Sequence, residues 1–215
     1  MGANSCPLCA SKFIGDYSQD FLRHYCECQI CGLIFVPRSE LISMADEKLR
    51  YDDHKNSPDD SDYRSYLEKV FFLIKPHLQA SDQGLDFGCG RSNVLQDLGA
   101  RENILIDSYD LFYHPNEKIW DRKYDFIILS EVIEHLRDPQ EELKRLRMIL
   151  KESGSLFIKT KLSLKTKMEF DNWFYKRDKT HIQFFNPSSF EKLSEMFQFQ
   201  LPEDLGQDLF LFKAK

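Results

Sequence analysis

Four cysteines near the start of the sequence have the spacing of metal ligands. Cys6 and Cys9 form one CxxC pair, and Cys28 and Cys31 form a second. Two such pairs offer four thiolates, which make the closed tetrahedral shell of a structural zinc site. Cys26 belongs to neither pair, so we interpret it as a spare thiol. Because four cysteine ligands leave no open position on the metal, we predict a structural zinc ion and not a catalytic one.

A second group of residues forms a glycine-containing loop between an expected strand and an expected helix. Asp86 closes the strand, and Gly88 and Gly90 flank Cys89 in the loop. Such a loop brings backbone N–H groups and the N-terminus of the helix close to a bound ligand. Taken alone, this pattern is a weak signature of nucleotide-containing ligands.

The next expected strand supplies an acidic residue for the same ligand. A carboxylate at the end of that strand is the usual partner of a ribose diol. Asp107 and Asp110 both compete for this role, and we favour Asp110 because residues 103–109 then form a strand of full length. The alternative role of Asp107 is a local hydrogen bond within the strand.

A third cluster combines two carboxylates with an imidazole. Glu131, Glu134 and His135 follow the apolar strand expected at 124–129, and they would share one face if a helix began there. Such side chains suit Mg²⁺, Mn²⁺ or Zn²⁺. Two alternatives stay open: Glu134 and His135 cap the helix and orient a loop, or His135 acts as a general base.

These residues need a framework, and strands and helices alternate from Gly84 onward. Alternation of this kind predicts a mostly parallel sheet covered by helices. The expected strands are residues 84–87, 103–109, 124–129, 155–160, 197–201 and 209–213. The expected helices are residues 63–78, 92–100, 138–150 and 188–196.

We divide the chain into three parts. A zinc-ribbon-like module spans 1–40, a linker and docking helix span 41–80, and a third domain spans 81–215. The linker includes a charged, turn-rich stretch at 51–60 that reads as a loop. The ribbon-like module is too small for a core of its own, so zinc would supply much of its folding energy.

The composition limits the classes of partner. The formal net charge of −6 argues against a whole-protein electrostatic attraction to nucleic acid. The sequence has no apolar run of membrane-spanning length, and its first residues lack the basic-then-apolar pattern of a signal peptide. We therefore expect a cytoplasmic protein without a membrane partner, in which paired cysteines bind metal and do not form disulfides.

The stretch Asp86-Phe87-Gly88-Cys89-Gly90 resembles motif I, D-x-G-C-G-x-G, of class I S-adenosylmethionine (SAM)-dependent methyltransferases. The resemblance extends over roughly residues 84–215. Residues 124–136 are similar to the fourth strand and E-V-I-E-H-L segment of the family, and 146–159 to its following helix end, glycine-containing turn and fifth strand, with Gly154 in the turn. The resemblance implies a Rossmann-like α/β sheet with helices on both faces and SAM as cofactor. A nicotinamide-dependent dehydrogenase fits less well, because its GxGxxG loop would need glycine at Asn93.

The resemblance also implies roles for individual residues. Asp86 would lie near the methionine amino group, Gly88 and Gly90 would let the cofactor backbone pass, and Asp110 would bind the ribose. The implied cofactor-binding set is completed by Phe87, Cys89, Leu111, Ser130 and Glu131.

A later segment, 173–185, follows the fifth strand, where the family usually has its substrate lid. Its His181, together with Glu131, Glu134 and His135, resembles the metal-binding pattern of small-RNA 2′-O-methyltransferases, and the E-x-x-E-H part also resembles ubiquinone-pathway O-methyltransferases. A metal there would lower the pKa of an acceptor hydroxyl, whereas without metal His181 is a second candidate general base. The candidate substrate contacts of this segment are Trp173, Tyr175, Arg177 and Asp178. Core packing is the alternative for the aromatic residues, and solvation is the alternative for the charged ones.

Two departures from the family pattern concern the adenine end of the cofactor. Ser92 replaces the third glycine of motif I, which would tighten the site. Residues 111–123 are too few for the usual helix and third strand. We therefore predict an abbreviated adenine pocket or one built from Phe112, Tyr113 and Trp120.

Three functions agree with these patterns. The first is methyl transfer to an oxygen of a small polar acceptor, such as a sugar or metabolite. The second is RNA methylation, including metal-dependent 2′-O-methylation; it is not favoured, because the ribbon-like module carries only Lys12, Arg23 and Arg38 as basic residues. The third is a methyltransferase fold that binds without catalysis.

Overall fold

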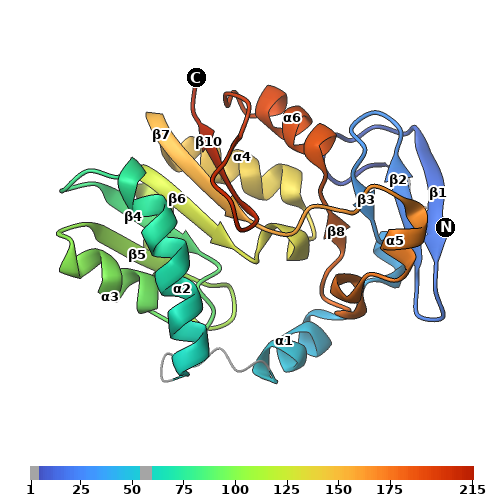
Figure 1. Cartoon of the computed structure of the whole chain (residues 1–215), viewed down its shortest axis with the longest axis horizontal. Coiled ribbons are helices and arrows are strands. Elements are labelled where there is room, and N and C mark those ends of the chain that lie inside the picture. Colours follow the sequence, from blue (N-terminus) through green and yellow to red (C-terminus); the bar gives the residue numbers. More distant parts are fainter. Residues whose placement is uncertain (1–4, 54–59) are drawn as a thin grey trace.

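The computed structural model describes residues 5–53 and 60–215. Its larger sheet has six strands in the order β5-β4-β6-β7-β10-β9 (Figure 1). The strands are β4 (Gln83–Phe87), β5 (Leu105–Tyr109), β6 (Tyr124–Ser130), β7 (Leu150–Lys159), β9 (Glu203–Asp204) and β10 (Leu209–Lys213). The first four in this order pair in parallel, whereas β10 is antiparallel to β7 and β9 to β10. The predicted mostly parallel sheet is confirmed.

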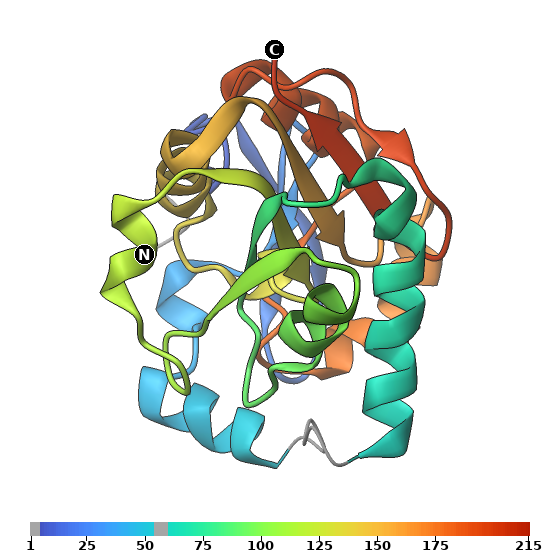
Figure 2. The same ribbon diagram turned by 90° about the vertical axis from the view of Figure 1, so that its left-hand side faces the viewer.

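Helices cover both faces of this sheet. They are α2 (Ser61–Ile74), α3 (Val94–Arg101), α4 (Pro139–Ile149) and α6 (Pro187–Met196). In β6, Phe126 and Ile128 pack in the core under α2 and α3, whereas Ile127 and Leu129 pack in the core under α4 and α6. Successive side chains of a strand point to opposite faces, so one apolar strand contributes to two cores. Figure 2 shows α2 and α4 on opposite sides of the sheet, as the predicted Rossmann-like α/β fold requires.

The sheet ends at β5 and has no further strand beyond it among the described residues. The connection from β5 to β6 contains the 3-10 helix η3 (Glu117–Asp121) and a bridge between Asp110 and His114. The prediction that this segment is too short for a helix and a third strand is therefore confirmed.

A smaller antiparallel sheet has the order β1-β2-β3-β8. Its strands are β1 (Ile14–Gln19), β2 (His24–Cys28), β3 (Ile34–Phe35) and β8 (Gln183–Phe184). Strand β8 follows the large sheet's β7 in the chain, yet Phe184 pairs with Ile34 of β3. Phe184 also packs against Tyr25 of β2. So does Phe170, which belongs to α5 (Lys167–Asp171). The small sheet thus crosses the boundary predicted at residue 40.

Helix α1 (Met44–Asp52) lies where the sequence predicts a linker. The predicted loop at 51–60 is wrong for Tyr51 and Asp52, which end this helix. Residues 54–59 of that loop lie outside the described residues. So do residues 1–4, the first residues of the predicted zinc-ribbon-like module. The Ser43 side chain accepts a hydrogen bond from the Asp46 N–H and so caps the helix. The helix has few apolar residues, and for this reason its hydrophobic periodicity does not predict it.

Two further expectations need correction. The strand predicted at 197–201 is wrong: only Phe199 makes a bridge, to Ala214, and Gln198 before it has a left-handed backbone with φ of +58°. Gly154 lies inside β7 and not in a turn, so this strand begins five residues earlier than predicted, at Leu150. In residues 5–53 and 60–215, no helix has the length and apolar character needed to cross a bilayer.

Candidate active site

A cavity of about 790 Å³ lies at the carboxyl edge of the parallel strands. The last residues of β4, β5, β6 and β7 all line it, and this edge is the usual place for ligands in open α/β sheets. The predicted site residues that line the cavity are Phe87, Gly88, Gly90, Asp110, Leu111, Ser130, Glu131, His135, Tyr175, Asp178 and His181. Those that do not are Asp86, Cys89 and Glu134, which are buried, together with Trp173 and Arg177.

The glycine loop forms one end of this cavity, the glycine-loop end. Gly88 and Gly90 have left-handed backbones, with φ of +83° and +64°. A Cβ atom on Gly88 would lie 2.5 Å from Cγ2 of Val132, whereas a Cβ atom on Gly90 would meet no described atom within 4 Å. The N–H of Gly88 donates to the carbonyl oxygen of Tyr109 at 2.7 Å and fixes the loop to β5. Gly90 therefore presents bare backbone to the open cavity, where a ligand can approach closely.

Asp110 closes the glycine-loop end from the other side. One oxygen accepts from the N–H of Gly90 at 3.1 Å, and the other accepts from the N–H groups of Phe112 and Tyr113 at 2.8 and 3.0 Å. Asp107 does not line the cavity and accepts from Arg122 and from the hydroxyl of Tyr124 at 2.7 and 2.8 Å. The geometry thus gives Asp110 the position facing a ligand and gives Asp107 a local role.

Asp86 is buried at the foot of the glycine loop. Burial and, next, the negative charge of Asp110 raise the pKa of the Asp86 carboxyl to about 7. A carboxyl of this kind ionises readily only when a positive group binds beside it.

The predicted adenine residues divide into two sets. Phe112 and Tyr113 line the cavity. Trp120 instead packs against Phe87 and Tyr109, with ring centroids 6.2 and 5.9 Å apart, and is not part of the lining. Ser92 is also buried and does not line the cavity. Its hydroxyl oxygen accepts a hydrogen bond from the Val94 N–H at 3.2 Å, at the start of α3. The expectation that Ser92 tightens the cofactor site therefore has no contact to support it.

A second part of the cavity, the histidine end, is lined by Glu131, His135, Tyr175 and His181, and Glu134 is buried beside them. No helix begins at Glu131, which has a left-handed φ of +53°; only the 3-10 turn η4 (Ile133–His135) follows it. The predicted shared helical face is therefore wrong. The hydroxyl of Tyr175, from η5 (Phe174–Arg177), bridges the carboxyls instead, at 3.0 Å from Oε2 of Glu131 and in hydrogen-bond contact with Glu134.

Both carboxyls of the histidine end hold their protons more tightly than usual. Burial and, next, the charge of Glu134 raise the pKa of Glu131 to about 7, and burial raises the pKa of Glu134. Oε2 of Glu134 is buried without a hydrogen-bond partner in the described part of the chain. An orphaned carboxyl oxygen of this kind suits a proton or a metal ion.

The two histidines have matching environments. Nδ1 of His135 is 2.9 Å from the carbonyl oxygen of Thr180, and Nδ1 of His181 is 2.7 Å from that of Tyr175. A carbonyl only accepts, so both Nδ1 atoms carry the proton and both Nε2 atoms are left as acceptors. Burial lowers the pKa of both rings, that of His181 to about 4, so both are neutral at pH 7. Ligand atoms of Glu134, His135 and His181 lie within 4.8 Å of one another, in a group that does not include Glu131.

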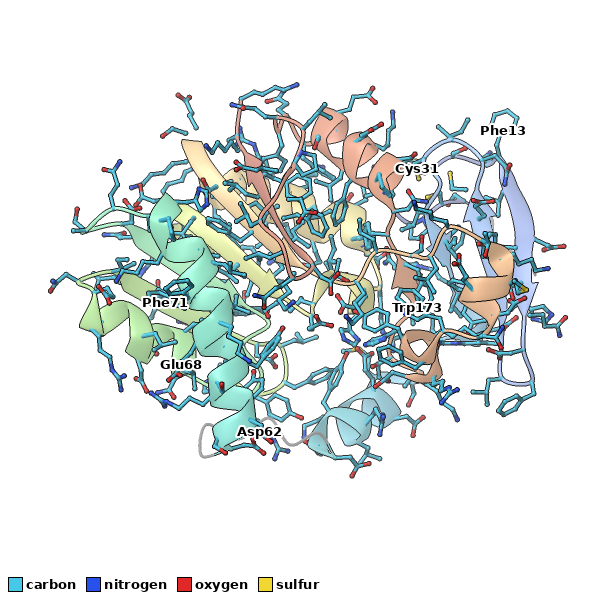
Figure 3. All side chains as sticks on the ribbon, in the orientation of Figure 1. Phe13, Cys31, Asp62, Glu68, Phe71 and Trp173 are labelled. Carbon is cyan, nitrogen blue, oxygen red and sulfur yellow. The ribbon has the colours of Figure 1, made fainter. Side chains whose placement is uncertain are left out.

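Two predicted substrate contacts do not reach the cavity. Trp173 is buried in the aromatic core with Phe170 and Phe184, beside the small sheet (Figure 3). Arg177 is exposed and outside the lining. The alternatives of core packing and solvation describe these two residues.

The four paired cysteines converge at the edge of the small sheet. The Sγ atoms of Cys6 and Cys31 are 3.6 Å apart, as are those of Cys9 and Cys28. All four Sγ atoms lie within 4.8 Å of one another. A zinc ion with Zn–S bonds of about 2.3 Å needs sulfur separations of about 3.8 Å. All six cysteines are among the described residues, and none forms a disulfide.

Sequence patterns missed a buried arginine that supports the histidine end. Arg23, in the turn between β1 and β2, donates to the carbonyl oxygens of Lys176, Asp178 and Lys179 at 2.7, 2.9 and 3.0 Å. These carbonyls belong to the segment that carries Tyr175 and His181. No local signal distinguishes Arg23 from an exposed arginine, because these three carbonyl partners lie more than 150 positions away.

Comparisons with known proteins agree on the fold. Residues 59–203 match a family model described as a methyltransferase domain. The structure of a SAM-dependent methyltransferase from Archaeoglobus fulgidus has 17% sequence identity and a TM-score of 0.54, over 70% of this chain and 94% of that one. The 1,6-didemethyltoxoflavin-N1-methyltransferase of Burkholderia thailandensis, solved with 1,6-didemethyltoxoflavin and S-adenosylhomocysteine (SAH), has 13% identity and a TM-score of 0.58, over 93% and 99%. No curated protein is significantly similar to the chain.

Proposed function

Because the chain belongs to the methyltransferase-domain family, we propose that its cavity binds SAM and delivers the methyl group to an oxygen of a small polar acceptor, such as a sugar or metabolite. The class, a SAM-dependent methyltransferase, comes from the family. The acceptor and the roles of the residues are the proposal. The observation that carries it is one cavity that residues of both the glycine-loop end and the histidine end line.

The glycine-loop end is the cofactor site in this proposal. Asp86, buried at the foot of the glycine loop, would bind the methionine amino group, and Gly90 leaves room for the cofactor backbone. Asp110 would take the ribose hydroxyls, and Phe112 with Tyr113 would take the adenine. Other lining residues in this set are Phe87, Gly88, Leu111 and Ser130, with Cys89 buried beneath them.

The histidine end is the acceptor site. When bound, SAM supplies a methyl group on a positively charged sulfur. As the acceptor oxygen bonds to the methyl carbon and the carbon–sulfur bond breaks, the hydroxyl proton must leave. We assign that proton to Glu131, which lines the cavity and has a pKa of about 7, close to the best value for a base at neutral pH. Tyr175 holds this carboxylate in place, while the neutral rings of His135 and His181 offer further acceptors.

Glu134, His135 and His181 also fit a divalent cation. Both histidines donate Nδ1–H to backbone carbonyls, as metal-binding histidines do, and Glu134 has an oxygen without a partner in the described chain. A cation there would lower the pKa of the acceptor hydroxyl. If activity survives EDTA treatment that leaves one zinc per chain, the cation has no part in the reaction and Glu131 acts alone.

The cysteine group is assigned to a structural zinc ion held by Cys6, Cys9, Cys28 and Cys31. Its distances support this assignment, and four thiolates leave no site for substrate. Metal analysis of the purified chain should give one zinc ion per molecule, and none after all four cysteines are replaced by serine.

The cofactor site is tested by calorimetry with SAH on two matched glycine variants. Gly90 and Gly206 both have left-handed backbones and free space at the Cβ position, but only Gly90 lines the cavity. Gly90→Ala should weaken SAH binding about tenfold, because the added methyl group meets the ligand. Gly206→Ala carries the same backbone strain and should bind like wild type. The absence of SAH binding to wild-type protein would contradict the proposed function.

The acceptor class is tested with methyl-deuterated SAM. Separate metabolite and RNA fractions of a cell extract are incubated with the enzyme, and labelled products are identified by mass spectrometry. The proposal expects label in oxygen-linked methyl groups of the metabolite fraction. Label confined to RNA would replace the small acceptor with a nucleic acid.

A further inference from the structure

Helix α1 lies outside the segment that matches the family, yet it forms part of the cavity wall. Met44, Glu47 and Tyr51 all line the cavity. Figure 1 shows α1 between the small sheet and the foot of α2. The helix therefore borders the site from a part of the chain to which the family motifs assign no role.

The last residue of α1 connects the two loops of the glycine-loop end. The Asp52 carboxylate accepts from the hydroxyl of Tyr113 at 2.6 Å and forms an ion pair with Arg91. Arg91 directly follows Gly90, and its guanidinium lies 4.8 Å from the ring centroid of Tyr113. Both Arg91 and Tyr113 line the cavity. One carboxylate thus joins the loop after β4 to the loop after β5.

The Asp52 carboxyl is ionised at physiological pH. The hydrogen bond from Tyr113, followed by that from Lys48, lowers the pKa of the carboxyl to about 2. The carboxylate therefore stays charged at neutral pH, and the strength of its contacts depends on salt because it is partly exposed.

Helix α1 also contacts Arg137 through Glu47 and the histidine end through Tyr51. Glu47 accepts two hydrogen bonds from Arg137, at 2.7 and 3.0 Å, and one from the hydroxyl of Tyr51 at 2.9 Å. The Tyr51 ring lies 5.9 Å from Phe112 and 5.5 Å from His135, measured between centroids. These contacts fix α1 in position, so Asp52 at its C-terminal end can restrain the loops that follow β4 and β5.

We propose that Asp52 is a positioning residue for the cofactor, which holds Arg91 of the glycine loop and Tyr113 of the next loop in one arrangement. Helix α1, whose Met44, Glu47 and Tyr51 line the cavity, would then form part of the cofactor site. This inference rests on the proposed function, namely that SAM occupies the glycine-loop end.

The chain offers a closely matched control at Asp107. Asp107 also pairs with one arginine and one tyrosine hydroxyl, and its side chain is 31% exposed against 29% for Asp52. Only Asp52 has its partners in the cavity lining. Asp52→Asn and Asp107→Asn each remove a carboxylate charge that contacts one arginine and one tyrosine hydroxyl, and Asp52→Asn also removes the ion pair with Lys48 within α1.

Full-length variants are compared by SAH calorimetry and by stopped-flow dissociation of SAH. Asp52→Asn should weaken SAH binding about five- to tenfold, mainly through faster dissociation, and Asp107→Asn should stay within about twofold of wild type. Asp52→Glu should restore part of the loss. Tyr113→Phe, which removes the same contact from the other side, should reproduce the faster dissociation and add little to Asp52→Asn.

Each outcome decides the inference. Wild-type dissociation rates in both Asp52→Asn and Tyr113→Phe would overturn it, as would equal losses in Asp52→Asn and Asp107→Asn. If Asp52→Asn does not fold, Tyr113→Phe alone decides. A wild-type protein that binds no SAH would instead overturn the proposed function, and this inference with it.

Discussion

The glycine-loop end and the histidine end of the cavity are built in different ways. At the glycine-loop end, Gly90 and Asp110 follow adjacent parallel strands, and main-chain N–H groups of the glycine loop donate to the Asp110 carboxylate and the Tyr109 carbonyl oxygen. At the histidine end, Glu131 follows β6, whereas Tyr175 and His181 lie on a later segment whose carbonyl oxygens accept from Arg23, in the turn between β1 and β2. One edge of a sheet thus carries a site fixed by local backbone and a site fixed by distant side chains. The two ends should therefore respond differently to the same kinds of change.

Removing the proposed zinc ion should have the largest effect and should act on the histidine end. Cys28→Ser with Cys31→Ser removes two of the four proposed zinc ligands, and so small a unit would depend on the metal for folding. Arg23 then loses its fixed position, so turnover should fall more than about 100-fold while SAH affinity stays within about threefold. Zinc content, calorimetry and turnover measure the three quantities. Equal losses of turnover and SAH binding would show that the ends are not separable.

Glu131→Gln should separate chemistry from cofactor binding. The substitution keeps the shape of the side chain but removes the proposed proton acceptor, so turnover should fall about 10²- to 10³-fold. SAH affinity should change less than about twofold, since Glu131 contacts Tyr175 of the histidine end and belongs to the proposed acceptor site. Glu142→Gln is the control, because Glu142 also lines the cavity but is outside the histidine end. Full turnover by Glu131→Gln would remove Glu131 from the reaction.

The contrast between the ends also explains how far the sequence predicts the site. Gly88, Gly90 and Asp110 could be found because a left-handed loop requires glycine and because strand ends meet at one edge of a sheet. The direction of Trp120 could not, since its ring packs under the loop in response to Phe87 and Tyr109. The conformational preferences of the backbone therefore predict the residues of the glycine-loop end but not how side chains pack around it.

The histidine end could be predicted as a set of residue types but not as a geometry. Glu131 and His135 are recognisable, yet the left-handed backbone of Glu131 replaces the expected helix. Tyr175 and Arg23 make their contacts across the whole chain, and such pairs have no local pattern. Helix α1 is similarly hidden, because charged contacts such as Glu47 with Arg137 hold it in place of an apolar stripe.

Arg23→Met should weaken the histidine end without removing any residue that lines it. Three carbonyls lose a buried donor, so the free energy of unfolding should fall by about 2–4 kcal/mol. The shifted segment should lower kcat/KM about ten- to thirtyfold at unchanged SAH affinity. Arg38→Met is the control: it lies in the same module but is exposed and pairs with Asp138 at the surface, so both quantities should stay near wild type. A loss of SAH affinity in Arg23→Met would contradict the separation of the ends.

The smallest expected effect is a pH dependence confined to the glycine-loop end. The pKa of Asp86 in the folded protein is about 7, above its ordinary value of 3.8, because burial and Asp110 disfavour the charge. In the proposed function, the ionised Asp86 carboxylate binds the positively charged amino group of SAH. The affinity for SAH should therefore rise about tenfold between pH 6 and pH 8 and level off above.

Stability without ligand should show the opposite trend. A raised pKa means that the folded state binds the proton more tightly than the unfolded state, so the contribution of Asp86 to stability is complete below about pH 4. It is lost as pH rises through about 7. Asp86→Asn cannot ionise, and it should flatten both curves: SAH affinity stays weak at every pH, and this part of the stability no longer varies. A pH dependence of SAH affinity that persists in Asp86→Asn would assign the titration to another group and leave the amino group of the cofactor without its proposed partner.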